Sequence, residues 1–263
     1  MRIFFLWLLF IAGSFKSFSQ QQFQLAPPLM QYRSVFFNDT AMLALKFQQA
    51  GAAIHYTLNK NEPTEHALLY THPIVIQDKI VTVKAKVFAK NFLPSDDVQI
   101  TFIKNGLSIE SVECTKPDEK YAGSGSNTLF DNMGGFAQSS AKTWMGFSSD
   151  TVSIEVALKQ PQKVEEVLLD FLQDEGSWIF LPETVNIYAY GLKDAEYNLI
   201  NSTHPFANKP TPGSSCVYKI IAGSRKIKTN KLLVQIITVK NIPEWHEAKG
   251  KHAWLFIDEL KVY

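Results

Sequence analysis

With 263 residues, of which 46% are hydrophobic and 13% aromatic, the chain is long enough for one large domain or two smaller ones, each with its own core. Its 26 Lys and Arg residues nearly balance 25 Asp and Glu residues, so the net charge of +1 provides no basic field for nucleic acid. Two cysteines exclude a disulfide-rich scaffold and a four-cysteine zinc site.

The first residues have the pattern of a secretory signal peptide. Arg2 is followed by an unbroken apolar run from Ile3 to Ala12 and then by small and polar residues up to Ser19. A membrane-spanning helix needs about 20 apolar residues, so this run is too short to cross a bilayer. We expect residues 1–19 to be removed and the protein to be exported to the periplasm, the outer surface or the medium. The alternative is an uncleaved anchor. No later run is apolar enough for a transmembrane segment.

Residues 23–105 predict a β-sandwich of the immunoglobulin-like or fibronectin-like kind. In VTVKAKVF, the apolar residues Val81, Val83, Ala85 and Val87 alternate with polar ones, which is typical of a half-solvated strand. Turn-rich stretches such as NKNEPT and KNFLPSDD separate this strand from similar runs at the spacing of an all-β sandwich.

This block also resembles a known module. The stretch GAAIHYTLNKNEPTEHALLYTHPIVI, followed by VTVKAKVFAKNFLPS, is similar to the small β-sandwich associated with chitobiases and β-hexosaminidases. Asn59 and Lys60 stand where that family usually has Asp-Gly, which should alter the turn without moving the strands. The resemblance implies a spacer or supporting role without catalysis.

Residues 107–263 predict a second all-β module, a jelly-roll sandwich. Its expected strands include TVSIEVAL, KVEEVLLDFL, TVNIYAY, CVYKII, KLLVQIITVK and AWLFIDELKVY, and no long helical period occurs. Cys114 and Cys216 both lie in this block. In an exported protein they form either one disulfide or two separate buried thiols, and the spacing favours neither.

Four separated motifs in the second block resemble the discoidin-like domain, also called the coagulation factor five/eight type C or galactose-binding-like domain. They are YAGSGSNTLFDNMGGF, TWMGF, LQDEGSWIFLPETVNIYAYG and NIPEWHEAKGKHAWLFIDEL. The version they resemble occurs at the C-termini of bacterial β-N-acetylhexosaminidases of glycoside hydrolase family twenty. Asp131-Asn132 replaces the family's usual Asp-Gly.

That resemblance implies a structural calcium site. Asp131 and Glu259 would supply carboxylate ligands, and carbonyl groups between Asp131 and Phe136 would supply the rest, in keeping with the oxygen ligands that Ca²⁺ prefers. The alternative is that Asp131 caps a turn and Glu259 is a solvated residue at the rim.

Catalysis is the less favoured reading. Adjacent acidic pairs occur at 118–119, 174–175 and 258–259, but neighbours on a strand point to opposite faces, so adjacency alone makes no catalytic dyad. The hexosaminidase catalytic barrel would need about 250 residues. No G-x-S-x-G elbow or H-E-x-x-H pair occurs. The alternative is that the chain is the C-terminal part of a β-N-acetylhexosaminidase-like protein and shares its hydrolase activity.

Aromatic residues in the second block indicate carbohydrate binding. An exposed ring can stack on the apolar face of a sugar, while polar neighbours fix the orientation of the sugar hydroxyls. Trp254 is expected in the core, whereas Trp144 and Trp178 flank loops and could be core or surface residues, with core packing as the default. The candidate binding residues are Trp245, His246, Lys249 and Trp178. The alternative for Trp245 is that it lies over the end of the sandwich and seals it. The sequence therefore predicts an exported, non-catalytic, glycan-binding accessory protein whose first module is a spacer. The alternative function is adhesion or protein interaction.

Overall fold

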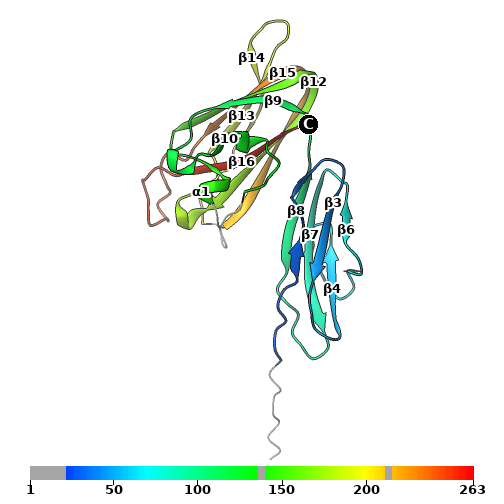
Figure 1. Cartoon of the computed structure of the whole chain (residues 1–263). Helices are drawn as coiled ribbons and strands as arrows, with labels where there is room; N and C mark the ends of the chain where they lie inside the picture. Colours follow the sequence, from blue (N-terminus) through cyan, green and yellow to red (C-terminus); the bar gives the residue numbers. More distant parts are fainter. Residues whose placement is uncertain (1–21, 136–139, 211–214) are drawn as a thin grey trace, which may run out of the picture.

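The computed structural model describes residues 22–135, 140–210 and 215–263, with the backbone alone described at 140, 141 and 215–226. The expected signal peptide therefore lies outside the described residues. The all-β prediction with two successive modules is confirmed (Figure 1). Among the described residues, no helix has both the length and the hydropathy to cross a membrane.

Two sheets form the first module. The three-stranded sheet has the order β1-β3-β6 and the five-stranded sheet has the order β2-β8-β7-β4-β5. The strands are β1 (Leu29–Gln31), β2 (Phe36–Phe37), β3 (Ala41–Lys46), β4 (Ala52–Thr57), β5 (Leu68–Leu69), β6 (Ile74–Ile76), β7 (Ile80–Ala89) and β8 (Val98–Lys104).

The alternation predicted for β7 is present in the structure. Val83, Ala85 and Val87 are fully buried, and the first two join the core between the sheets. In the turn after β4, Lys60 adopts φ of +67°, the left-handed conformation that glycine takes most easily. The turn therefore keeps a glycine-like backbone although the sequence has lysine, and β4 still pairs in register with β7.

The second module is one continuous sheet that folds over itself. Its order is β11-β16-β12-β15-β13-β14, and β9 also pairs with β12. The elements are β9 (Ile109–Cys114), η1 (Glu119–Tyr121), β10 (Gly123–Ser126), η2 (Asn127–Leu129), α1 (Ser140–Thr143), β11 (Met145–Phe147), β12 (Thr151–Asp174), η4 (Glu175–Ser177), β13 (Thr184–Tyr190), β14 (Tyr197–Thr203), β15 (Ser215–Ile237) and β16 (Leu255–Val262).

The long hairpin of β12 and β15 forms both layers of this sandwich. Its ladder is interrupted between Ala157 and Gln162, where Pro161 lies; proline has no N–H to donate to a ladder. The first half of β12 pairs with β9 and the second half with β16. Ile154 from one half and Phe171 from the other meet in the same core, so the break allows one strand to serve both layers.

The second half of β12 is buried on both faces. Leu169 and Phe171 face the core between the layers, whereas Leu168 packs against the first module and Leu172 against the fully buried Trp144. This double coverage explains why the segment reads as a nearly continuous apolar run and not as an alternating strand.

A β-bulge in β16 changes which residues share a face. Asp170 pairs with Glu259 and Phe171 with Ile257, so Asp258 is an extra residue in the ladder. Ile257 and Leu260, three positions apart, both face the core. Consequently Asp258 and Glu259 both lie on the opposite face, which differs from the strict alternation expected from the sequence.

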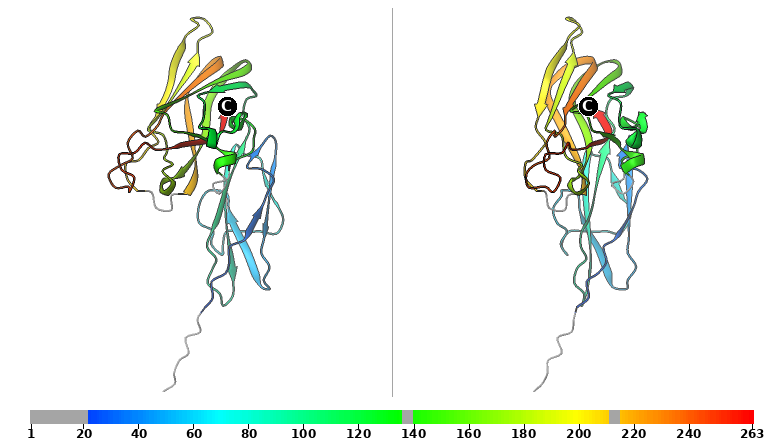
Figure 2. Two further views of the ribbon diagram at one scale, coloured as in Figure 1. Left: turned by 60° about the vertical axis from the view of Figure 1, so that its left-hand side comes forward. Right: turned by 90° about the vertical axis from the view of Figure 1, so that its left-hand side faces the viewer.

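The two modules are joined by a small apolar cluster. Phe36 and Ile103 of the first module pack against Leu168 of the second. The Tyr263 hydroxyl donates to the Lys104 carbonyl (2.6 Å), which places the C-terminus at the junction in Figures 1 and 2. Lys79 forms an ion pair with Glu166 and lies over the Tyr263 ring, 3.8 Å from its centroid.

Candidate functional site: a tryptophan loop and the expected calcium position

Two loops meet at the end of the second module, on the side away from the first module (Figures 1 and 2). One contains η4, and the other connects β15 to β16 through residues 238–254. The His246 Nε2–H donates to the carbonyl of Glu175 (3.0 Å), and the Trp254 N–H donates to the carbonyl of Trp178 (2.8 Å). The sequence motifs predicted to form a site are thus adjacent in space.

Trp178 is the exposed tryptophan of this region. It ends η4 with φ of +64°, and its side chain is 38% exposed. The left-handed region is strained for a bulky residue, and such strain is found mainly where a function requires it. The Trp178 N–H donates to the Glu175 carbonyl (2.9 Å), and the Trp178 carbonyl accepts from the Trp254 N–H. These two hydrogen bonds hold the backbone in this conformation.

Polar groups lie beside this indole in the chain. The Ser177 hydroxyl donates to Asp174 Oδ2 (2.7 Å), and Gly176 and Ser177 are exposed. An exposed ring with a carboxylate and a hydroxyl next to it provides both the apolar platform and the hydrogen-bonding groups that a sugar requires. Trp178 was one of the predicted binding residues, whereas Asp174 and Ser177 were not among them.

Trp245 has different surroundings. It is half-buried and packs against a cluster that contains Phe180, with ring centroids 6.2 Å apart. The contacts of Trp245 are those of a residue that closes the end of the sandwich, and its role as a sugar platform stays a prediction. Lys249 is exposed and forms an ion pair with Glu244 (3.2 Å).

His246 uses both ring nitrogens within the protein. The N–H of Ala248 donates to Nδ1 (3.0 Å), which fixes the neutral tautomer with the proton on Nε2. That proton is directed at the Glu175 carbonyl. The imidazole therefore positions η4, and its predicted contact with sugar would have to compete with these bonds.

The remaining tryptophans are packing residues. Trp144 is fully buried, as expected. Trp254 is half-buried and makes edge contacts with Tyr121 and Phe256, at centroid distances of 5.2 and 6.2 Å. Its backbone supports Trp178, so Trp254 contributes to the candidate site through the main chain.

The expected calcium ligands Asp131 and Glu259 both have hydrogen-bond partners within the protein. Glu259 is fully buried and accepts hydrogen bonds from the Asn132 N–H (3.0 Å) and from the Lys261 ammonium (2.8 Å). Asp131 is exposed, and its Oδ1 accepts from Met133 N–H (2.8 Å), which caps a turn. The alternative prediction was that Glu259 is a solvated rim residue and that Asp131 caps a turn. Its first part is wrong because Glu259 is buried, and its second part is confirmed. Among the described residues, no group of three or more His, Cys, Asp or Glu side chains is placed to hold a metal.

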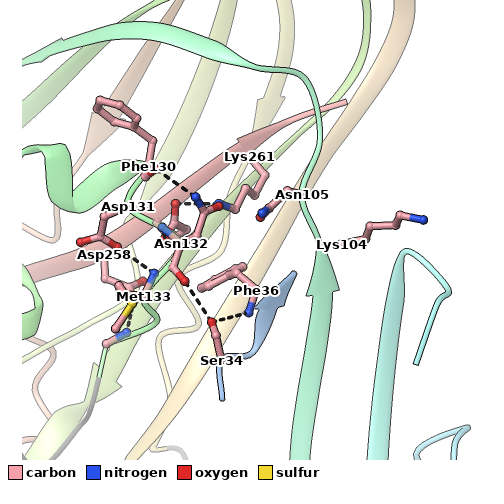
Figure 3. Close-up of polar contacts among 12 residues, drawn as sticks. Ser34, Phe36, Lys104, Asn105, Phe130, Asp131, Asn132, Met133, Asp258 and Lys261 are labelled. Atoms are coloured by element: carbon pink, nitrogen blue, oxygen red, sulfur yellow. Dashed lines mark hydrogen bonds and ion pairs between the residues drawn. The ribbon is translucent and has the colours of Figure 1, made fainter. Parts of the chain in front are cut away.

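Lys261 was missed by the sequence reasoning, although it lies two positions from Glu259 and therefore shares its strand face. Burial raises the pKa of Glu259 to about 7 and lowers the pKa of Lys261, although the partner's charge acts in the opposite direction in each case. Asn132, which replaces the family glycine, adopts φ of +65° and receives the Lys261 ammonium on Oδ1 (2.6 Å; Figure 3).

A buried carboxyl pair lies next to this cluster. Asp258 and Asp170 are each 2% exposed, and burial together with the charge of Asp170 raises the pKa of Asp258 well above its ordinary value. One oxygen of Asp258 accepts the Gly135 N–H. The bulge in β16 brings Asp258 to this face, so no alternating pattern could have revealed the pair.

Cys114 is a free, half-buried thiol, and burial raises its pKa. Of the two readings left open by the sequence, the structure supports separate thiols, with Cys216 in a part of β15 that is described by its backbone alone.

Comparison with known families and curated proteins gives one match, in the first module. Residues 43–102 match the family model described as "Fn3 associated". No curated protein matches the chain.

Solved structures with a similar arrangement include a GH29 fucosidase from Ruminococcus gnavus in complex with fucose. It is 10% identical, with a TM-score of 0.36, and the match covers 58% of this chain and 25% of the fucosidase. The matched region thus spans about a quarter of that chain.

Two smaller structures are matched over nearly their whole length. Chitosan-binding module 1 of a Paenibacillus sp. IK-5 chitosanase/glucanase is 15% identical, with a TM-score of 0.37 and coverage of 60% of this chain and 98% of the module. The family 32 carbohydrate-binding module of Streptococcus pneumoniae EndoD is 13% identical, with a TM-score of 0.38 and coverage of 60% and 96%.

Proposed function

We propose that the protein is an exported, non-catalytic carbohydrate-binding protein, in which the second module binds glycan and the first acts as a spacer. The proposal includes a place among the chitobiase- and hexosaminidase-associated modules, which the sequence motifs of both blocks resemble. The secretory pattern of residues 1–19 supports export.

The strained, exposed Trp178 is the observation that carries the proposal. A bulky side chain with φ of +64° is held in solvent by hydrogen bonds from two separate loops. The part of this side chain that stays in water, 38%, gains no burial energy, and the backbone that holds it there is strained. Stacking of the apolar face of a sugar on the Trp178 ring would account for this arrangement. Asp174 and Ser177, which are close to Trp178 in the chain, could then bind the sugar hydroxyls.

The acidic residues support the non-catalytic part of the proposal. Asp170, Asp258 and Glu259 lie near the β16 bulge, and each is at most 2% exposed. Glycoside hydrolysis needs two positioned carboxyl groups, or one together with an acetamido group of the substrate, within reach of the glycosidic bond. A substrate has no access to carboxyls that are buried beneath the loop of residues 131–135.

Substitution of Trp178 tests the proposal. The chain is titrated by calorimetry with chitosan oligosaccharide, pectin fragments and fucose, and we expect binding to at least one class of sugar at micromolar to millimolar Kd. Trp178→Ala should weaken that binding by about 1–3 kcal/mol, since the stacking face is lost. The melting temperature should fall by only a few degrees, because 38% of the side chain is already exposed in the folded state.

Phe23→Ala is the matched control, since Phe23 is an exposed aromatic residue (72%) of the first module. It should leave sugar binding unchanged. Equal binding by Trp178→Ala and the parent chain would contradict the proposed platform, and failure of every sugar on a broad glycan array would contradict carbohydrate binding as a whole.

A further inference from the structure

The buried cluster around Lys261 contains a complete set of partners for its ammonium group. The side chains of Lys261 and Glu259 are 6% and 1% exposed. The ammonium donates to Glu259 Oε1 (2.8 Å) and to Asn132 Oδ1 (2.6 Å), and it lies 4.7 Å from the centroid of the Phe36 ring. Two hydrogen bonds and one ring face thus surround a group that has three N–H donors.

The same ammonium connects three parts of the molecule. Glu259 belongs to β16, Asn132 to the loop before α1, and Phe36 to β2 of the first module. The loop is attached twice more, because the Asn132 N–H donates to Glu259 Oε2 (3.0 Å) and its carbonyl accepts from the Ser34 hydroxyl (2.9 Å; Figure 3). Removal of the cation would therefore release contacts on both sides of the junction.

The charges of the cluster make a second cation unfavourable. Calcium requires about six to eight oxygen ligands. Glu259 and Asn132 already direct oxygen atoms at the ammonium, and a divalent ion within reach of the same atoms would lie a few ångströms from a positive charge. A buried carboxylate needs one compensating charge, and Lys261 provides it.

We propose that Lys261 occupies the position of a structural cation, so that the loop of residues 131–135 and its contact with the first module are held without calcium. The covalently attached ammonium replaces an exchangeable ion. The junction between the modules is then insensitive to the calcium concentration outside the cell, and this conclusion is independent of the proposed glycan binding.

Calcium titration of the whole chain is the direct test. The melting temperature should be the same, within about 1 °C, in millimolar CaCl₂ and in EDTA, and calorimetry should show no binding heat for CaCl₂. Stoichiometric calcium binding, or a melting temperature that rises with CaCl₂ and falls with EDTA, would overturn the proposal.

A double-mutant cycle tests whether Lys261 is the cation of the cluster. Lys261→Met leaves Glu259 buried without its partner, and the melting temperature should fall by roughly 10 °C. Lys261→Met combined with Glu259→Gln should lose less than the sum of the two single changes. The control is Lys116→Met, which removes one partner of an exposed ion pair with Glu119 and should change nothing. Strictly additive losses would contradict the proposed pairing, and the calcium titration stands even if a variant fails to fold.

Discussion

Trp178 and Trp245 lie on neighbouring loops, yet their surroundings differ. Both were predicted as binding residues from their position among polar residues. The sequence correctly indicates which loops carry aromatic side chains, because turn residues and charges surround each one. It does not reveal which ring is covered, because Phe180, the residue that contacts Trp245, comes from a different segment of the chain.

Replacement of Trp245 separates packing from binding. Trp245→Ala leaves a cavity against Phe180, and we expect a loss of about 3 kcal/mol in the free energy of unfolding. Urea titration measures this loss, and calorimetry with the sugar found for the parent chain measures binding. A fully stable Trp245→Ala variant that no longer binds sugar would restore Trp245 as the platform.

Conformation at single residues was only partly predictable. At Lys60 and Asn132 the families that the sequence resembles usually have glycine, and the lysine was expected to alter its turn. Both residues instead adopt positive φ, as glycine would. Asparagine tolerates this region because its short side chain can hydrogen-bond locally, while for lysine the surrounding strands impose the conformation.

At the scale of elements, β16 was predicted as a strand, and its bulge was not. When both faces of a strand are buried, its residues do not alternate between apolar and polar. An extra residue in the ladder then leaves no signal in the sequence. The consequence is chemical: Asp258 and Glu259 share a face, and Asp258 lies against Asp170 of β12. The contact of Lys261 with Glu259, one of the expected calcium ligands, was not predicted either.

The buried carboxyl groups at the bulge should make the free energy of unfolding depend on pH in an unusual direction. The pKa of Asp258 is raised because it is buried and because Asp170 repels its charge, so the folded state retains a proton that the unfolded chain releases above about pH 4. The free energy of unfolding therefore falls as the pH rises from about 4 towards the folded-state pKa of Asp258. Glu259, with a pKa of about 7, contributes in the same direction.

Asp258→Asn should reduce this dependence. The amide still accepts the Gly135 N–H and can donate to Asp170, while the repulsion disappears. At pH 8 we expect the variant to be more stable than the parent by about 1 kcal/mol or more, with a smaller difference at pH 5. Urea titrations at both pH values measure this. Asp39→Asn, at an exposed position, is the control, and a parent chain that is stabilised by raising the pH would contradict the prediction.

At the scale of the whole molecule, two modules were predicted and found, but their contact was not. Leu168 reads as one apolar residue in a strand, and only the structure shows that it faces Phe36 and Ile103. Contacts between distant segments depend on how the modules pack, which no local period records.

The junction can be tested by placing a charge in it. Leu168→Asp should separate the modules, because a carboxylate would be buried against Phe36 and Ile103 without a partner. X-ray scattering should show a larger radius of gyration, and circular dichroism should show retained strands. Phe36→Ala should act in the same direction. Leu199→Asp, at an exposed position, should leave the scattering unchanged, and an unchanged radius for Leu168→Asp would show that the apolar cluster does not hold the junction.

The place of β16 in its sheet has a consequence for the order of folding. This strand comes late in the sequence but lies between β11 and β12, and the Leu107 N–H donates to the Val262 carbonyl (2.6 Å). The first module precedes the second in the chain and can fold as soon as its last strand, β8, has emerged. The second module cannot close its core until β16 arrives, because its ladder joins segments that are far apart in the sequence. A chain that crosses a membrane from its N-terminus would thus carry this module through in an open, threadable state and complete it only on the far side.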